Sequence, residues 1–295
     1  MTLSRRTLLA AVPALAAAST SAYALNVGNM VVEPLLDGPF PLSLDLIPAA
    51  NNPEGQALLT AAGLPAAGPV DVPVNGFVVR RLAGITLVDT GAGGRFGPAM
   101  GKLPDRLAAR GITPGMVGSI VLTHLHPDHA GGLVLPGGGA RFPNATLVVQ
   151  ADEAAYWTDN GARSRAVQGF DMFFVAAREV LETYKGRRRM VSGAAQISPG
   201  MTAVPMPGHT PGHMGLMLTD ANDSLLLWGD TVHSTALQLA KPEWSVVYDV
   251  DQAAAAATRA RVLDMAATDK VRVAGAHMAM QGRIERRGTG YALVS

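Results

Sequence analysis

The stretch THLHPDHAGG (residues 123–132) places three histidines and an aspartate within six residues. The whole chain holds only seven histidines, so a scarce residue is concentrated at one place. The stretch follows the apolar run GSIVLT (residues 118–123), which is typical of a buried strand. Side chains two apart on an extended chain point the same way, and a proline then begins a turn. Four potential metal ligands are predicted to converge on this loop: His124, His126, Asp128 and His129.

The ligand types in this cluster suit a transition metal. Imidazole and carboxylate together are favoured by zinc, iron, manganese or cobalt. The chain has no cysteine, which argues against a structural zinc site built from thiolates. Surface histidines that only form hydrogen bonds are the alternative explanation. That alternative fits a single histidine better than a cluster of this density.

Three further stretches place a polar residue where an apolar run stops. They are PMPGHTPGHMG (205–215) with His209 and His213, LLLWGDTVH (225–233) with Asp230, and VAGAHM (273–278) with His277. In layered α/β folds, functional residues gather in the loops that follow strands, because the rigid sheet positions them. These residues are therefore candidates for the same site.

The pattern of elements predicts one layered α/β domain. Hydrophobic residues make up 48% and charged residues 16% of the 295 positions, which is enough apolar material for a sizeable core. Strands interleave with helices, as in α/β folds. The expected strands are 75–81, 85–90, 118–123, 145–150, 201–206, 213–220, 224–229 and 271–277, and the expected helices are 103–111, 151–159, 173–184 and 252–267. The stretch 51–73, rich in Pro, Gly and Asn, is predicted to be a flexible, loop-like insertion.

The N-terminal stretch SRRTLLAAVPALAAASTSAYA (residues 4–24) has the features of an export signal. An arginine pair, Arg5 and Arg6, precedes a short apolar run that ends in the small-x-small sequence Ala22-Tyr23-Ala24. The arginine pair resembles a Tat signal. We therefore expect residues 1–24 to be a signal peptide, residues 25–295 to form the functional domain, and the protein to reside in the periplasm. The apolar run is too short and too rich in alanine for stable insertion across a membrane.

Charge argues against a nucleic-acid partner. The chain carries 24 Lys and Arg against 23 Asp and Glu, a formal net charge of +1. The one basic run, GRRRM (residues 186–190), is interpreted as a solvated face rather than part of a basic groove.

Taken together, these motifs resemble those of the metallo-β-lactamase superfamily, and they occur in the same order. They are LVDTG (87–91), THLHPDH (123–129), PGHTPGH (207–213), WGD (228–230) and GAH (275–277). Within that superfamily, PGHTPGH together with the stretch 225–251 is most similar to methyl parathion hydrolase and its exported relatives.

The resemblance implies an αββα sandwich, two facing mixed β-sheets with helices outside, and a centre of two divalent metal ions, expected to be zinc. One ion would be held by His124, His126 and His209, the other by Asp128, His129 and His277, with Asp230 bridging them. Asp89 would orient a ligand loop or an imidazole. His213 and His233 match no ligand position and are interpreted as packing or hydrogen-bonding histidines.

Such a centre predicts hydrolysis of an ester, lactone or organophosphate triester by a metal-bridging hydroxide. Asp128 and Asp230 are the candidate catalytic residues, because either could pass a proton to the leaving group. We expect a small hydrophobic substrate in an apolar pocket. Candidates for its wall are Trp157, Phe170, Phe173, Phe174, Trp244, Met278 and Met280. After His277 the chain reads MAMQG (278–282), where close relatives carry a turn containing proline and an aromatic residue, so the pocket wall is not fixed by the resemblance.

Other functions stay open at this point. An exported metallo-β-lactamase acting on β-lactams would share the export signal and the metals. A non-catalytic periplasmic metal-binding protein would share the ligands without turnover. A nuclease is disfavoured by the balanced charge. Redox di-iron members usually replace a histidine with a carboxylate, and no such replacement occurs here. The sequence does not determine the oligomeric state and leaves a homodimer open.

Overall fold

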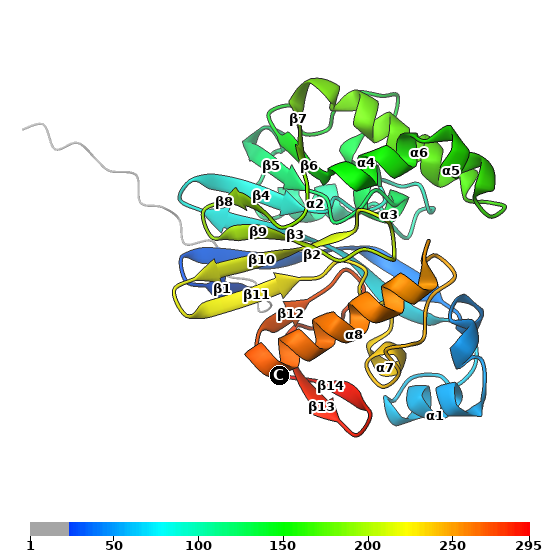
Figure 1. Ribbon diagram of the computed structural model, residues 1–295. Coiled ribbons are helices and arrows are strands. Elements are labelled where there is room, and N and C mark those ends of the chain that lie inside the picture. The colour runs from blue at the N-terminus through cyan, green and yellow to red at the C-terminus, as the bar shows by residue number, and fades with distance from the viewer. Residues whose placement is uncertain (1–23) are drawn as a thin grey trace, which may run out of the picture.

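The computed structural model describes residues 24–295 as two β-sheets stacked face to face with helices on both outer sides (Figure 1). This confirms the predicted αββα sandwich. The first sheet has the order β1-β2-β3-β4-β5-β6-β7 and the second the order β14-β13-β12-β11-β10-β9-β8. Both sheets contain parallel and antiparallel pairs. The predicted signal peptide lies outside the described residues, apart from Ala24.

The first sheet is built entirely from the chain before residue 192, and the second from the chain after residue 194. The strands of the first sheet are β1 (Leu25–Val27), β2 (Met30–Leu42), β3 (Val70–Arg81), β4 (Gly84–Val88), β5 (Val117–Val121), β6 (Thr146–Gln150) and β7 (Arg188–Val191). Those of the second are β8 (Ala195–Ser198), β9 (Met201–Pro205), β10 (Met214–Asp220), β11 (Asp223–Leu227), β12 (Arg272–Ala274), β13 (Gly282–Arg287) and β14 (Gly290–Val294).

Helices flank the two sheets and connect their strands. They are α1 (Pro53–Ala61), α2 (Leu103–Ala108), α3 (Pro127–Ala130), α4 (Ala151–Thr158), α5 (Asn160–Arg165), α6 (Asp171–Thr183), α7 (Thr235–Gln238) and α8 (Gln252–Asp269). In Figure 1, α4 and α6 lie outside the first sheet and the long helix α8 lies outside the second. Within residues 24–295, none of these helices combines the length and the apolar character that a membrane crossing requires.

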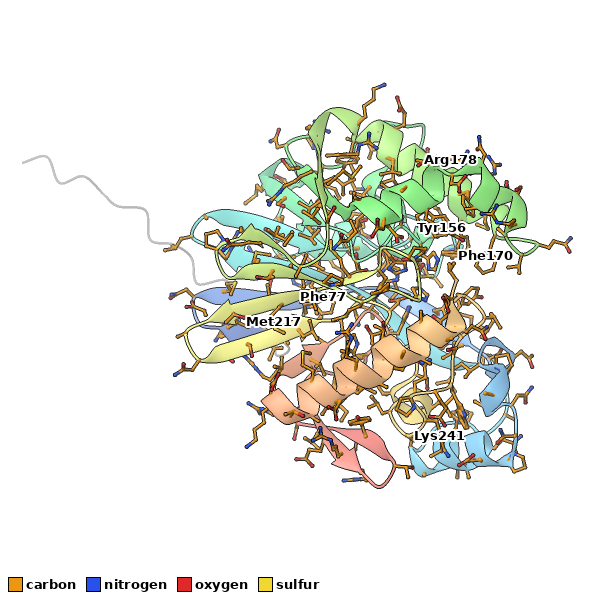
Figure 2. All side chains as sticks on the ribbon, in the orientation of Figure 1. Phe77, Tyr156, Phe170, Arg178, Met217 and Lys241 are labelled. Carbon is orange, nitrogen blue, oxygen red and sulfur yellow. The ribbon has the colours of Figure 1, made fainter. Side chains whose placement is uncertain are left out.

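The core consists of apolar layers inside and outside the sheets, because successive residues of a strand face opposite sides. On β11, Leu225 and Leu227 pack between the sheets, whereas Leu226 packs against the side covered by α8. Phe77 of β3, labelled in Figure 2, also lies in the layer between the sheets. Both faces of each sheet are therefore buried, which explains why several strands read as continuous apolar runs.

The prediction of a loop-like insertion over residues 51–73 was wrong. Residues 53–61 form α1, and β3 already begins at Val70. Asn52 and Pro53 begin this helix: the side chain of Asn52 accepts hydrogen bonds from the backbone N–H groups of Glu54 (2.8 Å) and Gly55 (3.1 Å). Leu59 is buried in an apolar cluster with residues from around α7.

Parallel strand pairs bring the polar strand ends together at one edge of the sandwich. Strand β4 runs parallel to β5, and β11 runs parallel to β12, so each pair ends at the same edge of its sheet. Asp89 follows β4, the histidine cluster follows β5, and Asp230 and His277 follow β11 and β12. The strand topology alone therefore brings these candidate ligands to one edge of the sandwich.

Candidate metal centre

The loops at this edge bring all seven predicted ligand side chains into two groups. The first group is His124, His126, His209 and Asp230, and the second is Asp128, His129, Asp230 and His277. In each group the nearest ligand atoms all lie within 4.8 Å of one another. Asp230 belongs to both groups, and every member except the half-buried Asp128 is buried. This membership is the one that the motif resemblance implied.

The first group is dominated by imidazole nitrogens. The Nε2 atom of His209 lies 3.2 Å from Nε2 of His124 and 3.0 Å from Nδ1 of His126. Burial, followed by the neighbouring imidazoles, holds the pKa of His124 and of His126 well below the ordinary value. A neutral imidazole keeps a lone pair on one ring nitrogen, so His124 and His126 can each offer that lone pair to a metal ion.

The second group mixes imidazoles with carboxylates. Nε2 of His129 lies 3.2 Å from Oδ1 of Asp230 and 3.4 Å from Oδ2 of Asp128, and Nε2 of His277 lies 3.2 Å from Oδ2 of Asp230. Burial lowers the pKa of His129, but the carboxylates of Asp230 and Asp128 outweigh it and raise the pKa well above the ordinary value. For Asp230 burial acts upward and the charges of His129 and His277 act downward, and the net pKa is well below the ordinary value. The bridging carboxylate is therefore ionised.

The outward-facing nitrogens fix which atom each ring presents to the group. Nδ1 of His129 donates to Asp89 (2.9 Å), Nδ1 of His209 donates to Asp249 (2.8 Å), and Nδ1 of His277 donates to a backbone carbonyl (2.9 Å). A metal ion binds the neutral form of an imidazole, and in that form a ring that donates from Nδ1 directs its Nε2 lone pair into the group. This arrangement is usual for histidines that bind a metal.

Unpartnered buried atoms test whether metal ions fit these residues. Buried polar side-chain atoms normally have a hydrogen-bond partner. Among the described residues, Nε2 of His129 and Oδ1 of Asp230 are buried without one, although they face each other in the second group. Divalent ions would satisfy both atoms, and the nitrogen-rich and mixed donor sets suit zinc, manganese, iron or cobalt. The residues therefore fit a pair of divalent ions.

Comparison with known proteins agrees with this geometry. A model of the metallo-beta-lactamase superfamily matches residues 69–277, which include all seven candidate ligands. The chain belongs to the metallo-β-lactamase superfamily.

Relatives with recorded activities are lactonases. The chain is 28% identical over 186 residues to N-acyl homoserine lactonase AttM from Agrobacterium fabrum, covering 53% of this chain and 64% of that protein. It is also 28% identical over 185 residues to an N-acyl homoserine lactonase from a Bacillus species, covering 56% and 66%. The matched region thus spans about two-thirds of the length of these relatives.

Two solved structures of the superfamily share nearly the whole fold. The hydrolase AbOPH of the beta lactamase superfamily aligns with a TM-score of 0.83 and 29% identity, over 92% of this chain and 96% of that one. The dizinc quorum-quenching lactonase AidC, solved with the product N-hexanoyl-L-homoserine, aligns with a TM-score of 0.86 and 23% identity over the same shares. The second likeness concerns the fold alone.

Asp89 occupies the position expected for the superfamily's supporting aspartate and contacts both a loop and an imidazole. Its carboxylate accepts hydrogen bonds from the backbone N–H and the hydroxyl of Thr123, both at 2.8 Å, as well as from His129. The hydroxyl of Thr123 in turn lies 3.1 Å from Nδ1 of His124. One carboxylate therefore supports a ligand of each group.

The sequence analysis missed Asp249, which supports His209. The Asp249 carboxylate accepts from His209 and lies 3.4 Å from Nη2 of Arg259, a fully buried guanidinium on α8. Burial lowers the pKa of Arg259, and the Asp249 charge opposes this shift. The hydrogen bond from His209 to Asp249 joins residues 40 positions apart, so it leaves no local pattern in the sequence.

The two remaining histidines form hydrogen bonds close to Asp230. Nε2 of His213 accepts from the backbone N–H of Asp230 (3.0 Å), and Nδ1 of His213 donates to the carbonyl of Met206 (2.9 Å). Nε2 of His233 lies 3.1 Å from Oδ2 of Asp230, and its ring stacks on His277 with centroids 5.1 Å apart. His233 also lines the cavity at the centre, a position that the sequence analysis did not assign to it.

An aromatic wall encloses the centre. Its cavity is lined by five of the seven ligands and by Phe40, Phe96, Phe173 and Tyr248. Phe170, labelled in Figure 2, packs on Phe173 and Tyr248 with ring centroids 4.9 and 5.8 Å apart. Of the wall candidates, Phe173 therefore lines the cavity and Phe170 supports it.

The other wall candidates lie elsewhere. Trp157 and Phe174 belong to the core beneath the first sheet, and Trp244 packs in the cluster around α1 and α7. Met278 and Met280 line a separate cavity of about 750 Å³, and none of the seven candidate ligands belongs to its lining. Residues 278–281, within the stretch where the chain departs from its close relatives, therefore contribute to that cavity and not to the aromatic wall. Phe40, Phe96 and Tyr248 were missed because they come from three distant loops and strands.

Proposed function

We propose that this protein is a dinuclear-metal hydrolase that cleaves lactone or ester bonds of small hydrophobic substrates, with N-acyl homoserine lactones as the first class to test. One observation carries the proposal: two ligand groups share Asp230 and open onto a cavity walled by aromatic rings. The names of the relatives found by sequence, AttM and the Bacillus N-acyl homoserine lactonase, favour lactones within this class. Zinc is the proposed metal, since the ligands are nitrogen and carboxylate oxygen.

The residues divide the catalytic work. Bound divalent ions lower the pKa of water and polarise a carbonyl or phosphoryl oxygen. Asp230 holds the two groups at a fixed separation. Asp128 is the most exposed of the ligands, with 16% of its side chain accessible, and is placed to pass a proton to the leaving group. The aromatic wall orients the substrate and excludes water.

Phosphotriesters are a second candidate substrate class. The resemblance of the stretch 225–251 to methyl parathion hydrolase favours them, and the wall is compatible with a neutral, apolar molecule. The described residues that line the cavity include no Lys or Arg. A β-lactam carries a carboxylate for which the described lining offers no Lys or Arg, so β-lactams rank below neutral lactones and esters.

Metal analysis combined with a substrate panel tests this function. We expect the purified protein to hold two divalent ions per chain and to hydrolyse an acyl homoserine lactone or an aryl ester at least about 100-fold faster than a chromogenic cephalosporin. A phosphotriester in the panel ranks the second class. Protein that is fully loaded with metal yet inert toward every member would instead indicate a metal-binding protein without catalysis.

We also propose that the protein is exported to the periplasm through the Tat pathway, on the basis of Arg5, Arg6 and the sequence Ala22-Tyr23-Ala24. Changing Arg5→Lys together with Arg6→Lys is expected to leave uncut protein in the cytoplasm, because the twin arginine is read by the export machinery. Cell fractionation with immunoblotting measures the change. Normal processing of the double variant would refute the Tat assignment, and Arg283→Lys on β13 serves as a control.

A further inference from the structure

A buried glutamate joins the two loops that supply the first ligand group. Glu153 lies in the first turn of α4 and is fully buried. Its carboxylate accepts four hydrogen bonds. On Oε1 the donors are the backbone N–H of Leu125 (2.8 Å) and the indole N–H of Trp157 (2.6 Å), and on Oε2 they are the hydroxyl of Thr210 (2.6 Å) and the backbone N–H of Gly212 (3.1 Å).

These donors flank the ligands on both loops. Leu125 lies between the ligands His124 and His126, on the loop that follows strand β5 of the first sheet. Thr210 adjoins the ligand His209, on the loop that follows strand β9 of the second sheet. The two oxygens of one carboxylate therefore hold two loops that come from different sheets. In this arrangement Nδ1 of His126 lies 3.0 Å from Nε2 of His209.

We propose that Glu153 is a positioning residue that sets the separation of the His126 loop and the His209 loop, and thereby the affinity of the first ligand group for its metal ion. The inference rests on the metal centre proposed above. The proposal predicts an effect on the first group and not on the second, because none of the four donors adjoins Asp128, His277 or Asp230 in the chain.

The chemistry of the four donors requires a carboxylate. Three of them are N–H groups, which can only donate. An amide at position 153 would replace one acceptor oxygen with an NH₂ group. In either orientation at least one N–H would then face another donor while buried, which is unfavourable.

Close packing makes this connection rigid. A Cβ atom added at Gly212 would lie 2.1 Å from the backbone nitrogen of Glu153, so the His209 loop rests directly on α4 and only glycine fits. The ring of Trp157, whose N–H is held by Glu153, packs edge-on against His126 with centroids 5.5 Å apart. A change at Glu153 is therefore transmitted to both ligand loops.

Stepwise zinc titration of the full chain against a chromophoric chelator tests the proposal. In Glu153→Gln we expect one of the two binding steps to weaken by about 10- to 100-fold, the range typical when a group that orients a metal ligand is lost. The other step should change by less than about threefold. The matched control is Glu179→Gln, an exposed carboxylate on α6 that pairs with Arg95 and contacts no ligand loop. It should change neither step.

Two backgrounds assign the weakened step. In His277→Ala, which disables the second group, Glu153→Gln should still weaken the remaining ion. In His209→Ala, which disables the first group, adding Glu153→Gln should lower the metal affinity little further, because the effects of residues that act through one another are not additive. Equal weakening of both steps, or no weakening of either, would overturn the proposal.

A milder variant covers the case in which Glu153→Gln does not fold. Thr210→Val removes only one of the four hydrogen bonds and keeps a similar volume, and it should weaken the same step by a smaller factor. An unchanged titration in Thr210→Val would overturn the proposal by itself. Failure of the proposed function is recognised separately, because wild-type protein would then bind fewer than two ions or hydrolyse no substrate.

Discussion

Asp230→Asn is expected to lower kcat/KM by at least about 100-fold, because loss of a ligand should exceed the 10- to 100-fold cost of losing a residue that merely orients one. Asp230 is the one described residue that belongs to both ligand groups. Its Oδ2 lies 3.4 Å from Nε2 of His209 and 3.2 Å from Nε2 of His277. Asparagine keeps the shape but removes the negative charge that both ligand groups share, so the affinity for the ions and the activity that depends on them should fall.

Steady-state kinetics with measured metal content checks this result. Added metal should restore occupancy better than it restores rate, since the ions return to a site with altered geometry. Asp223→Asn is a suitable control, because Asp223 lies at the other end of β11, is half exposed and pairs with Arg272. An Asp230→Asn enzyme with full activity at normal occupancy would contradict the bridging role.

Removal of the ions should abolish turnover and also lower the melting temperature. A ligand present at about 1,000 times its Kd stabilises the native state by about 4 kcal/mol. For a domain of this size that corresponds to a fall of roughly 8 °C or more in Tm. The buried atoms Nε2 of His129 and Oδ1 of Asp230 have no hydrogen-bond partner among the described residues, so removal of the ions should leave both unsatisfied.

Differential scanning fluorimetry and activity measurements before and after chelation test this expectation. Returning Zn²⁺, Mn²⁺ or Co²⁺ separately should recover both signals, and the rates will identify the preferred metal. Dialysis without chelator is the control. Undiminished hydrolysis by protein shown to be free of metal would exclude the proposed mechanism.

Much of the fold was predictable because the ligand motifs stand at strand ends. The apolar run before His124 is β5, and the runs before Asp89 and Asp230 are β4 and β11, as expected from their continuous hydrophobicity. Strand β2 left no such signal, since its sequence contains Pro34, Pro39 and Pro41. Strand β1 pairs only with the first three residues of β2, so the prolines lie where β2 has a free edge and need not donate.

The candidate site was predictable only as far as its ligands. Histidine and aspartate in dense motifs signal metal binding through their chemistry. Glu153 and Asp249 hold the ligand loops through buried contacts to residues 28 to 59 positions away, and a single sequence contains no record of such pairs. Phe40 and Tyr248 face the same cavity from opposite ends of the chain for the same reason.

The division of the chain into two consecutive sheets has a consequence for how the protein matures. Each ligand group takes residues from both halves, so neither group exists until the two sheets have docked. Ions bound there would act as cross-links that close long loops between the halves. Metal uptake would then follow the assembly of the sandwich and lock it, rather than initiate folding.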